Sequence, residues 1–274
     1  MSEVFGFDAY APKEIAERIA GVGVTKARLP VLAVIMLGIL AGGFIGFGAL
    51  YFTLVTSDAS LGYVGGRLLG ALCFCLGLLL VVVAGAELFT GNNLLVMAWA
   101  DGTLSTGEVL RNWTLVCLSN AVGAFGLALL VLLSGHLDAN GGAVGRQAVT
   151  IAVSKLSTSL DQVFIRAVLC NMLVCLAVWM SLAGRSVTDK AIAIVFPVSA
   201  FVAAGFEHSV ANMYLLPLAL MKQAISPVIV AGSDAIGVGS ALIHTVVVIL
   251  GNVIGGAGLV AVVYHLIYRR AIRP

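Results

Sequence analysis

Two short polar clusters interrupt long apolar stretches of this sequence. The second cluster, within Gly205–Asn212, places the carboxylate Glu207, the imidazole His208 and the amide Asn212 close together. An ionised side chain at the centre of a membrane-spanning helix costs about 2.5 to 3.5 kcal/mol even on the insertion scales. An imidazole can donate a hydrogen bond, and its unperturbed pKa of about 6.5 lets it exchange a proton near neutral pH. We therefore expect the cluster to serve a polar solute that crosses a membrane.

The first cluster repeats the second in outline. Val83-Ala-Gly-Ala-Glu87 aligns with Ala203-Ala-Gly-Phe-Glu207 at an offset of 120 residues, and Asn92 and Asn212 each follow their glutamate by five positions. The next apolar run contains Asn-x-x-Gly-x-x-Gly-Leu in both halves, at 120–127 and 252–259. Two matches in the same order indicate a duplicated unit.

The composition is that of an integral membrane protein. Of the 274 residues, 61% are hydrophobic and 10% are charged, whereas soluble domains carry about 25% charged residues. The 32 glycines suit closely packed membrane helices. The net charge of +2 is too small and too dispersed to suggest a nucleic-acid partner, and the five cysteines have the spacing of neither a zinc site nor a redox motif. No metal and no cofactor are expected.

Six apolar runs are long enough to cross a bilayer, which needs about 20 residues. The second and fifth are too long for one simple crossing, and each contains one of the polar clusters. Backbone that breaks at membrane depth is tolerated where it lines a cavity or is buried in protein, so we expect the second and fifth helices to be broken. The predicted limits are 29–56, 65–100, 109–134, 163–182, 190–221 and 240–268.

The predicted fold is therefore all-α, with six transmembrane helices in two three-helix repeats. Because three is an odd number, the second repeat must be inverted in the membrane. Inverted repeats with matching broken helices indicate a binding site at the membrane midplane. Half-helices that begin near Gly91 and Ser209 would aim their positive dipole ends at that site, which favours an anion.

The distribution of Lys and Arg predicts the orientation. Ten of these fifteen residues fall on the side of the N-terminus, and cytoplasmic loops carry the excess of Lys and Arg. Both termini are therefore expected in the cytoplasm. This divides the chain into a cytoplasmic N-terminal segment 1–28, a single transmembrane domain 29–268 and a cytoplasmic tail 269–274.

Two segments lie outside the spans. In the first, Pro12 begins a short amphipathic helix with Ile15 and Ile19 on its apolar face, and such a helix can lie along a membrane surface. The second segment, 136–162, is interpreted as a loop. It holds Lys155, which is either a solvated loop charge or a residue that attracts anions.

The motifs of this chain resemble those of the formate/nitrite transporter family. The matching motifs are Gly85-Ala-Glu-Leu-Phe-Thr-Gly-Asn92, Asn171-Met-Leu-Val-Cys-Leu-Ala177 and Gly205-Phe-Glu-His-Ser-Val-Ala-Asn-Met213. The resemblance implies an aquaporin-like protomer in a homopentamer of a bacterial-type inner membrane, with a pore in each subunit. It implies passage of formate, nitrite or hydrosulfide, by a channel or a proton-coupled mechanism. Phe89-Thr90 and the run Trp179–Ser186 favour formate among these anions, whereas Gly91-Asn92-Asn93 departs from the formate members and keeps nitrite open.

The resemblance also assigns roles to individual residues. It makes His208 the central pore histidine and Thr90 its polar neighbour on the opposite loop, and it places Lys155 and Asn171 at the polar approach and the central site. Asn92, Asn171 and Asn212 either line the pore or cap backbone groups that the breaks leave without a hydrogen bond. The two implied apolar constrictions consist of Leu78, Leu88, Phe89, Phe74 and Phe201.

Glu87 and Glu207 are expected to brace the breaks at Gly85 and Gly205 by accepting hydrogen bonds from exposed backbone N–H groups. His208 is expected to donate a hydrogen bond or a proton to the anion, which would otherwise cross a dry, apolar pore.

Other functions fit less well. A membrane-embedded enzyme could use Glu207 and His208 as acid and base, but no nucleophile motif accompanies them. A water channel should carry Asn-Pro-Ala at both half-helix starts, and this chain has Asn92-Asn-Leu94 and Ala211-Asn-Met213 there. A haem-binding anchor needs paired histidines. His244 is instead expected to bond to a neighbouring helix, and His265 to be solvated at a span end.

Overall fold

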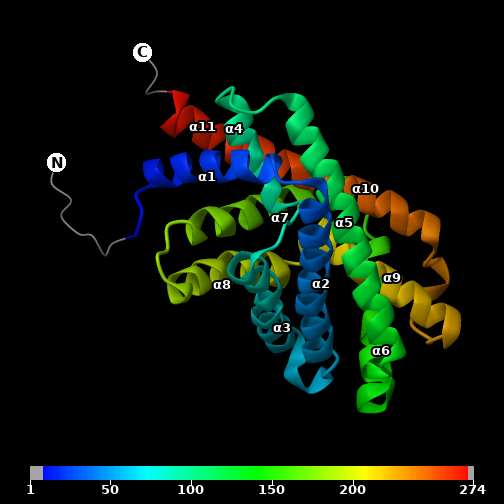
Figure 1. Cartoon of the computed structure of the whole chain (residues 1–274). Coiled ribbons are helices and arrows are strands. Elements are labelled where there is room, and N and C mark those ends of the chain that lie inside the picture. Colours follow the sequence, from blue (N-terminus) through cyan, green and yellow to red (C-terminus); the bar gives the residue numbers. More distant parts are fainter. Residues whose placement is uncertain (1–8, 271–274) are drawn as a thin grey trace.

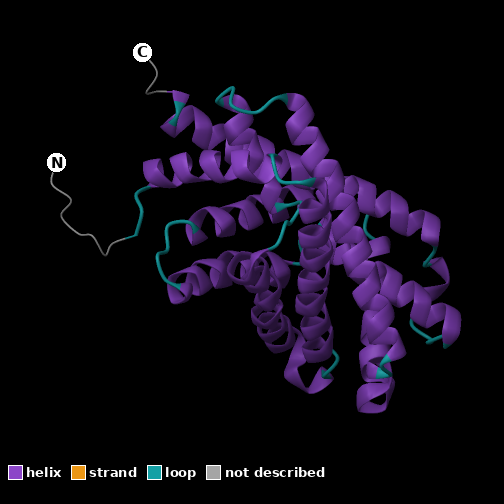
Figure 2. Ribbon diagram, viewed as in Figure 1, coloured by secondary structure: helices purple, strands orange, loops and turns teal. Residues whose placement is uncertain are grey.

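The computed structural model describes residues 9–270, and within that range the chain forms only helices and loops (Figures 1 and 2). The parts of the predicted terminal segments at 1–8 and 271–274 lie outside the described residues. The six predicted spans are confirmed. The helices that are long and apolar enough to cross a membrane are Val31–Thr56, Ala59–Gly85, Thr106–Leu133, Leu160–Ser181, Val187–Ala204 and Val238–Tyr268.

The first break follows the second span, as predicted. Helix α3 (Gly62–Leu79) continues into a π-helical segment, η2 (Leu80–Gly85), and ends at Gly85 with a φ of +89°. This left-handed conformation is readily adopted by glycine, which has no Cβ. The chain resumes at Gly91, the predicted start, but as the 3₁₀ turn η3 (Gly91–Leu95) before the short helix α4 (Val96–Ala100).

The second break has the same design with a longer half-helix. Helix α8 (Val187–Ala204) ends at Gly205, whose φ is +73°, and α9 (Ser209–Ile225) begins at the predicted residue. Both predicted breaks are therefore confirmed.

The packing of the helices confirms the inverted repeat. In the first unit α2 (Val31–Thr56) packs on α3 and on α5 (Thr106–Leu133). In the second unit α7 (Leu160–Ser181) packs in the same way on α8 and on α10 (Val238–Val253). Contacts between α3 and α8 and between α5 and α9 join the two units.

The segment 136–162 is not a loop, so that prediction is wrong. After a 3₁₀ turn, η4 (His136–Asp138), it forms helix α6 (Ala139–Leu156), with left-handed residues at 140–142 near its start. Its apolar positions Val144, Ala148 and Ala152 recur every four residues and are buried, on a helix that packs against α9. Lys155 therefore lies in the last helical turn.

Helix α6 is the counterpart of α1 (Pro12–Ala27), the helix predicted to begin at Pro12. Ile15 and Ile19 are buried. The helix packs along η3 and α4 and against α11 (Val263–Tyr268), beside which it lies in Figure 1. Each unit thus begins with a helix packed on its own half-helix. The remaining short elements are η1 (Ala59–Leu61), η5 (Ser233–Ala235) and the π-helical η6 (Ile254–Val262).

His265 is buried, so the prediction of a solvated side chain is wrong. Its Nδ1 lies 3.3 Å from Oδ1 of Asp101, which follows α4, and Arg269 also pairs with this carboxylate. Because His265 is on α11, the pair ties the last helix to the first half-helix.

Matching glycines let the helices of each unit approach closely. A Cβ on Gly123 of α5 would overlap the carbonyl oxygen of Ile39 on α2. A Cβ on Gly255 would overlap the carbonyl oxygen of Val168 on α7. These glycines are equivalent positions of the repeated Asn-x-x-Gly-x-x-Gly-Leu motif, which explains the motif as a helix-contact pattern.

We predict that Gly123→Ala and Gly255→Ala each destabilise the protein by about 1 to 3 kcal/mol, the usual cost of overpacking. The matched controls are Gly126→Ala and Gly258→Ala, because an added Cβ there has nothing within 4 Å. Thermal unfolding in detergent should show lower midpoints for the first pair only. Equal midpoints for all four variants would contradict the close packing.

Candidate functional site

His208 and Thr90 join the two breaks at the centre of the protein. Thr90 Oγ1 lies 3.1 Å from His208 Nε2, and the two residues are 0% and 3% exposed. His208 is also the N-cap of α9, since its Nδ1 accepts a hydrogen bond of 3.1 Å from the backbone N–H of Ala211. A nitrogen that accepts carries no proton, so the hydrogen-bond network assigns the proton of a neutral ring to Nε2. His208 therefore donates to the Thr90 hydroxyl.

A cavity of about 700 Å³, which we call the Lys155 vestibule, reaches His208 from one side. Besides Lys155 it is lined by Phe74 and Phe201, whose rings meet edge to face at 5.9 Å. The ring of Phe201 also stacks on that of His208 at 5.9 Å. The aromatic pair thus lines the vestibule directly beside the imidazole.

A second cavity of about 420 Å³, the Lys26 vestibule, belongs to the other unit. Leu78 and Leu88 line it together with Lys26 and Glu87. Because the units are inverted, we place the two vestibules on opposite sides of the Thr90–His208 pair. Phe89 lines neither cavity; its ring packs edge to face on Trp113 at 6.4 Å.

Glu87 is buried and forms an ion pair, with its Oε1 at 2.9 Å from Lys26 Nζ. Asn92 links the two partners: its Nδ2 donates to Glu87 Oε2 at 2.7 Å and its Oδ1 accepts from Lys26 at 3.1 Å. The same Nδ2 donates to Oδ1 of Asn112 on α5 at 2.9 Å. The carboxylate is thus held by side chains from α1 and from the start of η3.

Glu207 has the equivalent partners in the second unit. Its Oε2 lies 2.8 Å from Nζ of Lys155 and accepts from Nδ2 of Asn212 at 2.9 Å. His244 Nε2 lies 3.3 Å from the same oxygen, so His244 bonds to the break rather than to a neighbouring helix. Both carboxylates are bonded to side chains, and the prediction that they accept from freed backbone N–H groups is wrong.

Two asparagines satisfy that backbone instead. Asn120 Oδ1 accepts from the N–H of Phe89, and its Nδ2 donates to the carbonyls of Gly38 and Glu87, at 2.8 to 2.9 Å. Asn252 occupies the equivalent position in the second unit. Its Oδ1 accepts from the N–H of Ser209, and its Nδ2 donates to the carbonyls of Ala167 and Glu207, at 2.8 to 3.0 Å. They belong to the repeated motif, but sequence reasoning gave them no role.

Asn171 is buried in the scaffold. Its Nδ2 donates to the carbonyl oxygens of Asn252 and Thr90, at 2.7 and 3.3 Å, and to Oδ1 of Asn93 at 3.0 Å. It lines neither vestibule. Asn171 therefore holds the loop that presents Thr90.

Sequence reasoning missed Lys26 as a site residue. A signal existed, because Gly23-Val-Thr-Lys26 and Ala152-Val-Ser-Lys155 share a pattern of small residue, Val, hydroxyl and Lys. This pattern is weak evidence, because Lys26 ends an amphipathic helix, where a lysine is usually a surface charge. Asn112, which bonds to Asn92, and His244, which bonds to Glu207, are of different residue types. No pattern in the sequence therefore relates them, and only the fold brings them to the two breaks.

The chain is similar to known anion channels over most of its length. Residues 13–266 match the family model described as formate/nitrite transporter. The formate channel FocA of Escherichia coli (strain K12) is 38% identical over 279 residues, which cover 96% of each chain. The uncharacterized transporter YrhG of Bacillus subtilis (strain 168) is 38% identical over 263 residues, 94% of each chain.

Solved structures agree with these similarities. A pentameric formate channel with formate bound matches with a TM-score of 0.82 at 37% identity, over 87% of this chain and 97% of that chain. An FNT family ion channel matches with a TM-score of 0.81 at 28% identity, over 93% and 98% of the two chains. This chain belongs to the formate/nitrite transporter family.

Proposed function

We propose that this protein lets small monovalent anions, foremost formate, cross a cell membrane through a pore in each subunit, and that it is not an enzyme. The observation that carries the proposal is the Thr90–His208 pair, which lies between two vestibules behind apolar side chains. The formate channels among its relatives support formate over nitrite and hydrosulfide. A flux assay that compares the three anions tests this choice.

The lysine–glutamate pairs suit the approach of an anion. A buried carboxylate without a partner would repel the permeant, whereas Lys26 and Lys155 neutralise Glu87 and Glu207 at 2.9 and 2.8 Å. Both lysines line their vestibules. An anion therefore enters each vestibule beside an ammonium group and meets no net negative charge from the pair.

The apolar constrictions raise the free energy that a bare anion needs to cross the pore. Removing an ion from water costs several kcal/mol, and Phe74, Phe201, Leu78 and Leu88 offer no hydrogen bonds in return. The Thr90–His208 pair lies between them. Because the Thr90 hydroxyl accepts from His208, its own proton is free to be donated to an anion.

If both ring nitrogens of His208 carried a proton, the Nδ1–H group would face the backbone N–H of Ala211. Two donors would then oppose each other without an acceptor. The cap therefore favours a neutral imidazole that acts as a hydrogen-bond donor. Loss of the Nε2 proton to the anion would leave an anionic imidazolate, so the neutral ring acts on the anion as a hydrogen-bond donor.

We predict that His208→Ala changes the pH dependence of formate flux in proteoliposomes. Without the donor, the remaining flux is carried by neutral formic acid, whose fraction falls about tenfold for each pH unit above the pKa of the acid. The flux of the variant should follow that slope, while wild type declines less steeply. His136→Ala is the matched control and should keep the wild-type profile. An unaltered profile in His208→Ala would rule out this role.

We predict that Lys26→Gln lowers formate flux by about tenfold or more, because it leaves the buried Glu87 carboxylate without its counter-ion. The double variant Lys26→Gln with Glu87→Gln should recover part of the flux. Lys13→Gln removes an exposed charge from the same helix and should behave as wild type. If the double variant were no better than Lys26→Gln, charge compensation would not be the reason.

The subunit is proposed to assemble as a homopentamer, with the Lys26 vestibule and both termini in the cytoplasm and a bacterial-type inner membrane as its location. The pentameric relative supports the assembly. The exposed apolar side chains of the spanning helices support the membrane location, and the excess of Lys and Arg on one side supports the orientation. We predict a particle of five 28.2 kDa subunits in native mass spectrometry. A monomer or trimer in mild detergent would contradict it.

A further inference from the structure

The two vestibules differ in charge although the scaffold is repeated. Among residues 9–270, the charged side chains that line the Lys26 vestibule are Lys26 and Glu87, which neutralise one another. The Lys155 vestibule has the matching pair and, in addition, Arg67, Arg166 and Asp58. The Asp58 carboxyl stays ionised, since hydrogen bonds from Ser60 lower its pKa. One net positive charge therefore remains on this side and none on the other.

Of the two extra arginines, Arg67 bonds to the backbone that directly follows Phe201. It is half-buried on α3, and its Nε donates to the carbonyl of Ala203 at 2.9 Å while Nη2 lies 3.4 Å from the carbonyl of Val202. These carbonyls end α8 directly after Phe201. A Cβ at Gly205 would lie 2.7 Å from Nη2, so the left-handed glycine also makes room for the guanidinium.

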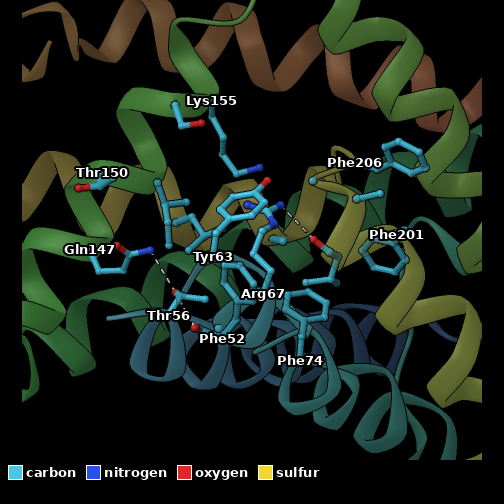
Figure 3. A pocket seen from close by; sticks show the side chains of 18 of the residues that line it. Phe52, Thr56, Tyr63, Arg67, Phe74, Gln147, Thr150, Lys155, Phe201 and Phe206 are labelled. Atoms are coloured by element: carbon cyan, nitrogen blue, oxygen red, sulfur yellow. Dashed lines mark hydrogen bonds between the residues drawn. The ribbon is translucent and has the colours of Figure 1, made fainter. Parts of the chain in front are cut away.

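The guanidinium retains donors for a ligand. It has five N–H groups, and among the residues that the structure describes, those of Nη1 have no hydrogen-bond partner. In Figure 3 the side chains of Arg67, Tyr63 and Lys155 converge in the same cavity, with the rings of Phe74 and Phe201 beside it. Lys155 is engaged by Glu207, whereas Arg67 has no carboxylate partner within residues 9–270.

We propose that Arg67 forms an anion-binding subsite at the entrance to the Phe74–Phe201 constriction, which the Lys26 vestibule lacks. The proposal rests on the function proposed above. Charge-assisted hydrogen bonds from a guanidinium to a carboxylate are stronger than those to neutral carbonyls. An anion that enters from this side is therefore held by Nη1 before it meets the aromatic rings.

The subsite is tested with benzenesulfonate, a permanently charged anion that is much larger than formate. It is added to proteoliposomes on one side only, with subunit orientation checked by protease accessibility, and its inhibition constant for formate flux is measured. Arg67→Gln should raise the constant about tenfold on the Lys155 side, equivalent to about 1.4 kcal/mol. Inhibition from the Lys26 side should not change.

Two variants separate binding from a structural role. Arg67→Lys keeps the charge and should restore inhibition to within about threefold of wild type. Arg146→Gln removes an exposed arginine that also donates to a backbone carbonyl, that of Gly141, but lies outside the vestibule; it should have no effect. If Arg67→Gln instead lowered maximal flux in both directions with an unchanged inhibition constant, Arg67 would only cap α8 and the proposal would be wrong.

The result does not depend on formate being the permeant. Calorimetric titration of benzenesulfonate into the purified, full-length protein should show the same tenfold weakening in Arg67→Gln. Absence of formate flux in wild type would overturn the proposed function, whereas equal affinities of wild type and Arg67→Gln would overturn the subsite.

Discussion

A helix that breaks inside a membrane exposes backbone groups that no water can satisfy, and the rest of this structure depends on how that need is met. Asn120 and Asn252 each use one side-chain amide to bond an N–H and a carbonyl that lie two residues apart at a break. Each also donates to a carbonyl of the neighbouring spanning helix, at Gly38 or Ala167. The breaks are therefore fixed to the long helices, and side chains at the breaks are left to do chemistry.

The second constraint is charge. Glu87 and Glu207 are both nearly inaccessible, and a buried carboxylate is tolerable only when it is paired. The partners come from α1 and α6, helices that add nothing to the number of spans. This explains why each unit begins with an extra helix: it carries the lysine to the glutamate. The lysines that pair with the carboxylates also line the two vestibules, so each ion pair fixes part of a vestibule wall.

Sequence reasoning reached the features that leave a local trace. Glycine beside a charged residue in an apolar run predicted both breaks, and the length of the runs predicted six spans. It did not find the contacts that depend on distant segments. Lys26 and Glu87 are 61 positions apart in the numbering, and nothing local distinguishes Lys26 from a surface lysine. Helix α6 was missed because its polar start, at 140–142, is typical of a loop. The backbone N–H groups at the breaks bond to Asn120 and Asn252 rather than to the glutamates, and these asparagines lie in other spans.

The repeat also separates residues that build the protein from residues that act on a solute. Glutamates, lysines, asparagines and contact glycines match between the units and form the scaffold. At the offset of 120 that aligns the breaks, His208 corresponds to Leu88 and Thr90 to Val210, while Arg67 corresponds to Val187. A strictly symmetric pore would present the same groups from both sides and have no distinct donor at its centre. His208, Thr90 and Arg67 occupy positions at which the two repeats carry different residues. The difference between the two sides of the pathway therefore arises from side chains that are present in one repeat only, although the repeated scaffold holds them in place.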